Sequence, residues 1–297
     1  MTTTAVRPTQ RPSRLIPRRP TKNRILAAWA RHAVTIAILV IMLYPIIWMV
    51  DASFRPNALI GGNVPFTGPF TLQNYIDGLT PTSTLNFGLY FVNSFAIAAL
   101  CVLGNLIACT LTGFAFARLE FPFKRVLFAL VMGTLLLPYQ VTLVPQYIIF
   151  NKIGWLNTFL PLVAPKFLAV DAFFIFLLVQ FIRGLPRDLD EAARLDGCGN
   201  WGIFRRVILP LLGPAIATTA MFTFINAWND FLGPTLYLSD PSKYTVPQGL
   251  AMFVDSTGQS SYGSLLAMAT LSIAPLIGFF LAAQRLLTQG IATTGIK

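Results

Sequence analysis

The chain has 297 residues, of which 55% are hydrophobic and 11% are charged, and its formal net charge is +11. A soluble domain usually carries roughly 25% charged residues, so this composition excludes an ordinary water-exposed protein and predicts one that is embedded in a bilayer. The basic residues stand in short segments between apolar runs. They do not form a stripe interleaved with aromatic residues, which argues against nucleic acid as a partner.

Residues 1–32 form a basic segment that is rich in Thr and Pro and has no acidic residue. We expect a disordered cytoplasmic tail. A cleaved signal peptide is the alternative, but the next apolar run is too long for its hydrophobic region and no small-residue cleavage site follows. The cysteines Cys101, Cys109 and Cys198 and the single His32 lack metal-ligand spacing, so no metal or other cofactor is expected. Cys101 and Cys109 are interpreted as packing residues.

Six apolar windows of about 20 residues follow, the length that spans the hydrocarbon core. They predict an all-α integral membrane protein with one transmembrane domain over 33–297, and the spans lie at about 33–51, 91–117, 126–150, 158–182, 211–238 and 264–287. If odd loops face outward, eighteen Lys and Arg residues lie inside and three outside, and Lys166 lies within the fourth span. By the positive-inside rule, both termini are cytoplasmic.

The loop between the fourth and fifth spans, 184–210, predicts a short cytoplasmic helix. Pro186 suits a first helical turn, and acidic residues at 188, 190 and 191 stand where the helix dipole favours negative charge. Two ion pairs four residues apart are expected, Arg187 with Glu191 and Asp190 with Arg194. Apolar residues at helical spacing form one stripe, namely Leu185, Leu189, Ala192 and Leu195.

Gly197 and Gly199 are expected to end this helix with positive φ. A second short helix over 201–208 is expected to stop before Pro210. Two short helices joined by a glycine break make a compact knob that another protein can grip. The residues alone leave an alternative, an interfacial helix lying on lipid.

The same loop resembles the EAA signature of binding-protein-dependent ABC import permeases. It reads Glu191-Ala192-Ala193, three residues, Gly197, nine residues, Val207, one residue, and Leu209-Pro210. The family usually has Ile where this chain has Val207, a difference of one methylene. The resemblance implies that the loop docks into an ATPase subunit, where Glu191 pairs with a base, Ala192 and Ala193 permit close approach and Gly197 provides the turn. The implied coupling residues are Glu191, Ala192, Ala193, Asp196, Gly197, Leu209 and Pro210.

Further segments resemble the sugar-importer branch of this family, which includes maltose-type and glycerol-3-phosphate-type permeases. They are Asn93-Ser94, Trp228-Asn229-Asp230-Phe231, the segment 244–250 and Gln284-Arg285. The resemblance implies a non-catalytic permease subunit in the bacterial inner membrane that carries a sugar or sugar-like solute, with a glycerol-3-phosphate or glycerophosphodiester importer as the alternative. Its partners would be membrane lipid, an ATPase dimer, a second and non-identical permease chain, and an extracytoplasmic solute-binding protein.

Polar residues inside the spans indicate a candidate pore face, because charge in a membrane is costly unless it faces a cavity or partner. Asn226, Asn229 and Asp230 share one helical face in the fifth predicted span. Hydrogen bonding between helices is the alternative role. The resemblance also implies that the third outer loop, 239–263, reaches the binding protein, with Gln248 and Gln259 as candidate contacts. A solvated connector is the alternative.

Two other classes of function find less support in the sequence. A proton-coupled secondary transporter would use Asp171 and Asp230 as relay carboxylates and Lys166 as their counter-charge, but such proteins usually show internal repeats and none is visible. A membrane enzyme would need a nucleophile and base or a metal cluster, and no such set is found. The sequence also lacks G-x-x-x-x-G-K-[ST], so a partner would have to supply ATP hydrolysis.

Overall fold

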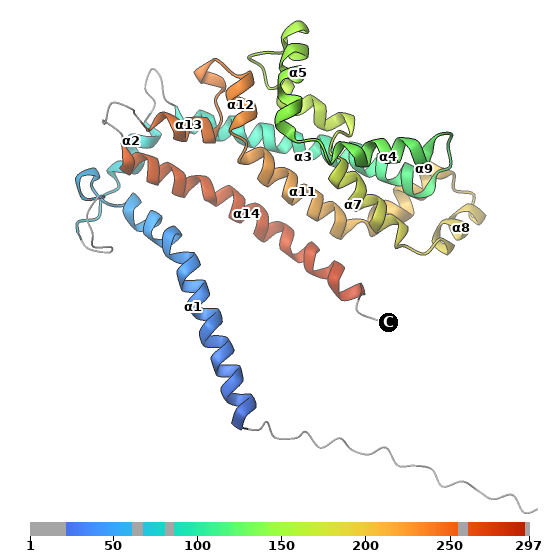
Figure 1. The fold of residues 1–297 in the computed structure, drawn as a ribbon, viewed down its shortest axis with the longest axis horizontal. Coiled ribbons are helices and arrows are strands. Elements are labelled where there is room, and N and C mark those ends of the chain that lie inside the picture. Colours follow the sequence, from blue (N-terminus) through green and yellow to red (C-terminus); the bar gives the residue numbers. More distant parts are fainter. Residues whose placement is uncertain (1–21, 61–67, 81–85, 255–260, 295–297) are drawn as a thin grey trace, which may run out of the picture. The chain divides into compact units, whose positions relative to one another are not determined.

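The computed structural model describes residues 22–60, 68–80, 86–254 and 261–294, and every regular element within these ranges is helical. The chain divides into two units, residues 1–48 and 49–297. In the first unit the described element is α1, which begins at Lys22 and ends in the second unit at Ser53 (Figure 1). Residues 22–32, predicted as disordered tail, are therefore helical. Their Ala, Leu, Lys and Arg residues favour helix once an apolar span follows. Residues 1–21 lie outside the described ranges.

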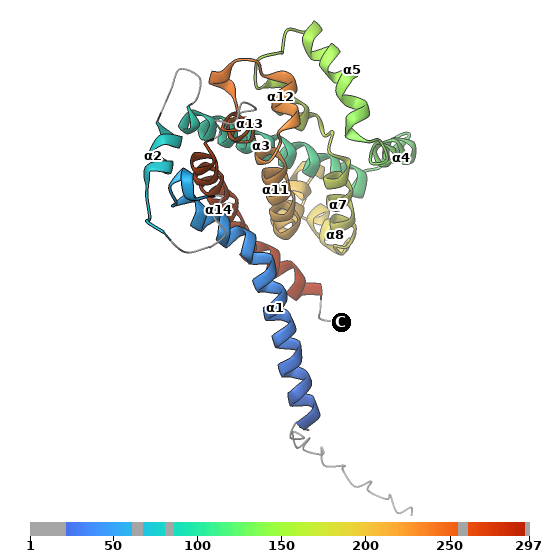
Figure 2. The ribbon, with the colours of Figure 1, turned by 60° about the vertical axis from the view of Figure 1, so that its left-hand side comes forward.

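The second unit is built around α3 (Phe87–Arg118). It packs along α7 (Ala172–Arg183) and α11 (Gly213–Trp228), and α11 also packs along α14 (Tyr262–Thr294), as the ribbon shows from two directions (Figures 1 and 2). Lipid is as apolar as a leucine side chain, so such helices gain stability from close packing and internal hydrogen bonds. Gly113 of α3 meets α7 so closely that an added Cβ would lie 2.9 Å from Cβ of Leu178.

Among the described residues, four helical segments are long and apolar enough to cross a membrane: Trp29–Ser53, Phe87–Arg118, Leu160–Arg183 and Tyr262–Gln284. Two bent pairs meet the same criterion if each pair is one span. The first joins α4 (Lys124–Thr134) to α5 (Tyr139–Lys152) at 102°, and the second joins Asn200–Leu211 to α11 at 76°. The third predicted span, 126–150, is thus broken, because Pro138 lacks the N–H that would continue the helix.

The fourth and fifth predicted spans are interrupted as well. In 158–182, a short α6 (Leu160–Val163) and a 3₁₀ turn (Ala164–Leu168) precede α7. Ala169, which lies between the 3₁₀ turn and α7, has φ of 55°. In 211–238, α11 ends at Trp228 and α12 (Leu232–Tyr237) follows. An apolar window predicts that a segment is long enough to cross the bilayer. It does not predict where single residues within that segment leave the helical conformation.

Two sequence segments that resemble the sugar branch lie against each other. The Asn93 side chain donates to the carbonyls of Ser242 (2.9 Å) and Tyr244 (3.0 Å), and Ser94 accepts from the N–H of Val246 (2.8 Å). These bonds tie the start of α3 to the segment before α13 (Val246–Met252). Polar side chains therefore fix the predicted third outer loop to the helix bundle.

Replacing Gly113 with Ala should destabilise the bundle by about 1–3 kcal/mol, because the added methyl forces α3 away from the fully buried Leu178. The measurement is the thermal midpoint of the purified chain in detergent. Gly133→Ala is the matched control, since nothing lies within 4 Å of its added Cβ. An equal or higher midpoint for Gly113→Ala would contradict this close-packing interpretation.

Candidate functional site

The predicted cytoplasmic helix is present as α8 (Asp188–Leu195), and it has three acidic residues in its first turn. It ends in a Schellman motif: the N–H of Gly197 bonds to the carbonyl of Arg194 (3.0 Å) and the N–H of Cys198 to that of Ala193 (2.9 Å). Gly197 has φ of +82° as expected. The expectation for Gly199 is wrong, because its φ is −73° and it lies before the next helix in extended backbone.

The second short helix begins at α9 (Asn200–Ile203) and does not stop before Pro210. It passes through a π-helical turn over Phe204–Ile208 into α10 (Leu209–Leu211), and the chain bends at Leu212. A proline ring displaces the carbonyl four residues before it. The wider π turn directly before Pro210 accommodates that ring without ending the helix.

A buried ion pair anchors α8 to the end of α3. Nε of Arg118 lies 2.7 Å from Oδ2 of Asp190, and their side chains are 6% and 12% exposed. The Arg118 guanidinium also donates to the carbonyl of Leu185 (2.9 Å), just before α8. The predicted pairing of Asp190 with Arg194 is therefore wrong. The sequence spacing offered a partner on the same helix, whereas the fold brings a base from 72 positions earlier in the chain.

The inner face of the loop is part of the hydrophobic core. Ala193, Ile203, Phe204 and Ile208 join Leu212 in a buried cluster with side chains of α3 and α7. The ring of Phe204 lies 5.2 Å from that of Phe114 on α3. Ala193 is only 7% exposed, so its small side chain allows the loop to approach its own bundle. The expectation that Ala193 allows approach to another protein does not fit this position.

The outer face of the loop presents apolar side chains. Leu195 is 90% exposed, Trp201 64% and Leu189 39%. Ala192 and Glu191 are also exposed. Three members of the predicted apolar stripe thus point away from the core, while Leu185 packs against it. Asp196 and Pro210 are exposed and Leu209 is half-buried. The outer side of α8 also exposes the charged Asp188, Glu191 and Arg194. A helix that is held from one side and exposes apolar side chains among charged ones on the other is a surface suited to a protein partner.

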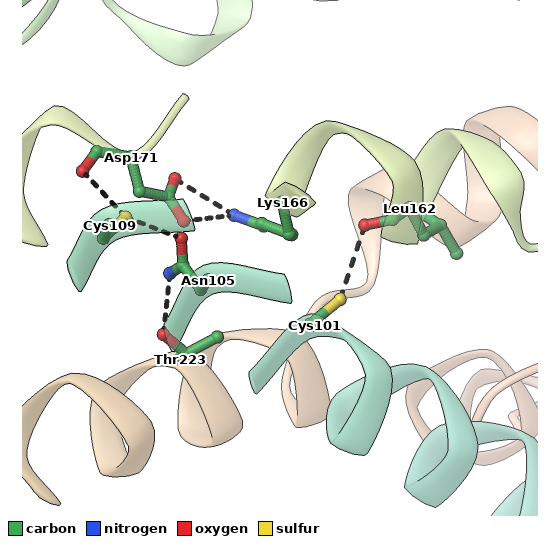
Figure 3. A network of polar contacts seen from close by, with 7 residues as sticks. All are labelled: Cys101, Asn105, Cys109, Leu162, Lys166, Asp171 and Thr223. Atoms are coloured by element: carbon green, nitrogen blue, oxygen red, sulfur yellow. Dashed lines mark hydrogen bonds and ion pairs between the residues drawn. The ribbon is translucent and has the colours of Figure 1, made fainter. Parts of the chain in front are cut away.

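A polar network lies deeper in the predicted membrane region (Figure 3). The Asn105 amide on α3 donates to Oγ1 of Thr223 on α11 (2.9 Å), and the Cys109 thiol donates to Asn105 (3.2 Å). Nζ of Lys166 lies 2.9 Å from Oδ2 of Asp171, across the break before α7. Cys101 and Cys109 are both buried, which confirms their interpretation as packing residues.

The structure separates the three candidate pore residues. Asn226 and Asn229 are exposed at the end of α11, on a face that also carries Phe222, which is 44% exposed. Asp230 lies past the end of this helix and accepts the N–H of Gly233 (3.0 Å). The predicted common helical face of all three is therefore wrong, because the helix ends at Trp228. Asn226 and Asn229 keep a shared exposed side.

Of the two outer-loop candidates, the structure describes only Gln248, and its side chain is buried. Gln248 is 7% exposed, and its Oε1 accepts the N–H of Thr245 (3.1 Å) in a capping box at the start of α13. The Gln248 side chain therefore caps the N-terminus of α13. Gln259 lies outside the described residues.

The chain is similar to known transport proteins. The profile of a family described as "Binding-protein-dependent transport system inner membrane component" matches residues 109–293. An arabinooligosaccharides transport system permease of Halalkalibacterium halodurans is 32% identical over 261 residues, which cover 86% of this chain and 92% of the relative. A trehalose/maltose transport system permease of Thermococcus litoralis is 33% identical, with 87% and 92% covered.

A solved structure shares the fold. It is described as the crystal structure of a bacterial ABC transporter involved in the import of the acidic polysaccharide alginate. One of its chains aligns with a TM-score of 0.77 at 22% identity, and the alignment covers 91% of this chain and 99% of that one.

Replacing Asp190 with Ala should cost about 3–5 kcal/mol, because it leaves the Arg118 charge buried without its counter-charge. We expect faster trypsin cleavage after Arg187 and Arg194 and a lower thermal midpoint. Asp188→Ala, an exposed change in the same helical turn, is the control. If both variants are cleaved at the wild-type rate, the ion pair does not anchor α8.

Proposed function

Since this chain belongs to the family of binding-protein-dependent transport system inner membrane components, we propose that it is a permease subunit of an ABC importer for a saccharide. The relatives named above transport arabinooligosaccharides and trehalose or maltose, which supports a saccharide over a glycerol phosphate ester. The chain itself is non-catalytic in this proposal. It forms half of the translocation path, and a second, non-identical permease chain forms the other half.

The observation that carries the proposal is the two-sided character of α8. Its inner side is bound to the bundle through Asp190 and Ala193, and its outer side exposes Leu189, Ala192 and Leu195. In our proposal the outer side docks into an ATPase subunit, and the exposed Glu191 pairs there with a base. Gly197 and the π-helical turn shape the rest of this coupling loop. Force on α8 then reaches α3 directly, because the Arg118 ion pair joins the two helices.

ATP binding to a dimer of ATPase subunits drives the cycle in this proposal. Closure of that dimer moves the coupling loop, and the spans tilt to open the path to the outside. The loop has to contact the ATPase differently in its open and closed states, since equal contacts would shift no equilibrium. A solute-binding protein delivers the saccharide from outside, which agrees with the description of the family.

We further propose six crossings with both termini in the cytoplasm of a bacterial cell. Each bent pair then contributes one crossing, and the exposed Asn226 and Asn229 face the path or the second permease chain. The distribution of basic residues supports this orientation. The coupling loop lies on the cytoplasmic side, where the ATPase is found.

Replacing Glu191 with Lys should lower ATP-dependent uptake at least about tenfold, because a like charge at a docked interface costs more than 1.4 kcal/mol. The assay uses the complete transporter in vesicles, with co-purification of the ATPase as a second readout. Lys152→Glu reverses an exposed charge away from the loop and should leave uptake unchanged. Normal uptake by Glu191→Lys would refute docking through α8.

The native cysteines test the orientation without any substitution. Cys198 in the coupling loop is half-exposed, whereas Cys101 and Cys109 are buried in the bundle. A membrane-impermeant maleimide should label one cysteine in inside-out vesicles and none in right-side-out vesicles. Bound ATPase should slow this labelling. Labelling of Cys198 from the outside would reverse the proposed topology while leaving the family membership intact.

A further inference from the structure

A cavity of about 540 Å³ lies where three helices end, and no residue of the coupling loop, 184–210, lines it. Its wall is formed by the last turn of α3, the start of α4 and the last residue of α7, Arg183. In the proposed topology these three ends lie at the cytoplasmic surface of the membrane. The lining residues are Phe116, Glu120, Phe121, Phe123, Lys124, Arg125, Val126, Phe128 and Arg183.

The cavity carries excess positive charge. Within the described part of the chain, Lys124 and Glu120 form its one ion pair, at 3.0 Å. Lys124 also donates to the carbonyl of Leu119 (2.6 Å), so its ammonium is held in the turn. The hydrogen bond from Lys124 holds the pKa of Glu120 below its ordinary value, and the acid stays charged. Arg125 acts on Glu120 only through its longer-range charge, and among the described residues neither Arg125 nor Arg183 has a carboxylate at ion-pair distance.

The aromatic wall positions one of these guanidinium groups. Arg183 lies over the ring of Phe128, with Cζ 5.5 Å from the ring centroid. A cation on an aromatic face keeps its N–H edges free to donate. Phe128 in turn packs against Phe116 of α3, with ring centroids 5.3 Å apart. The Arg183 guanidinium is therefore held in place while its donors stay available to an anion.

The rim of the cavity is apolar and faces away from the bundle. Phe123 has φ of 60°, a left-handed conformation that bulky residues rarely adopt, and its side chain is 77% exposed. On α4, Val126 is 56% exposed and Leu130 is 63% exposed. The site thus combines donors for an anion with an adjoining apolar surface that extends along a membrane helix.

We propose that this cavity binds the phosphate headgroup of an anionic phospholipid, whose acyl chain lies along the exposed side of α4. Guanidinium groups bind phosphate with several N–H donors at once, and basic pockets at helix ends are the sites where membrane proteins hold anionic lipids. The combination of cations and apolar rim fits a lipid better than a free anion, which would gain nothing from Phe123 or Val126. The inference rests on the proposed membrane orientation only for the choice of leaflet.

The test uses the full-length chain in phosphatidylcholine vesicles that contain a minor fraction of photoactivatable phosphatidylglycerol. Crosslinked peptides are mapped by mass spectrometry, and photoactivatable phosphatidylcholine serves as the parallel probe. We expect phosphatidylglycerol adducts on the segment 116–130 in excess over phosphatidylcholine adducts. Arg125→Gln should lower this excess about fivefold, the effect of one basic residue near a membrane surface.

Arg183→Gln should lower the excess by the same factor. If loss of the contact with Phe128 unfolds the Arg183→Gln variant, Arg125→Gln still tests the proposal. Lys152→Gln removes an exposed charge at the far end of α5 and is the matched control. Equal labelling by both lipids, or an excess that survives both arginine variants, would overturn the proposal. Binding of inorganic phosphate by the chain, without any excess of phosphatidylglycerol adducts, would assign the cavity to a free anion and overturn it too. None of these readouts involves transport, so they are independent of the proposed function.

Discussion

The ion pair of Arg118 with Asp190 is the interaction on which the proposed coupling depends. It joins the last residue of the central helix α3 to the first turn of α8, and both side chains are withdrawn from water. A buried pair of this kind adds little net stability relative to apolar residues, but breaking it is costly. Its value lies in geometry, because it fixes the direction in which α8 presents its outer side.

The surrounding core holds the proposed coupling loop against the bundle. Ala193, Ile203, Phe204 and Ile208 belong to the same cluster as side chains of α3 and α7, so the loop moves as part of the bundle. Rigid attachment is what transmission of force requires, since a loop that yields locally would absorb a partner's movement. In the proposed assembly, the exposed Leu195 and Trp201 belong to the surface that docks onto the ATPase subunit.

Inside the bundle, polar contacts lie both at a helix interruption and between intact helices. Lys166 and Asp171 face each other across the break before α7, and Asn105 joins α3 to α11 through Thr223. Freed backbone groups in a membrane need partners within the protein. Interrupted helices therefore place short, irregular segments where side chains from several helices meet. In the proposed transport cycle, these breaks provide the local freedom that alternating access demands.

The sequence by itself determined the class of the protein, because apolar length, charge distribution and the spacing from Glu191 to Pro210 are local properties of the chain. It also predicted α8 and the positive φ of Gly197, which arise from neighbouring residues. The capping role of Gln248 is local as well, because its partner Thr245 stands three residues before it. Only the tertiary structure decided that Asp190 pairs with Arg118 and that Ala193 is buried. Each of these outcomes depends on a partner or packing surface supplied by the folded chain, and for Asp190 a base 72 positions away in the chain competes with the local one at Arg194.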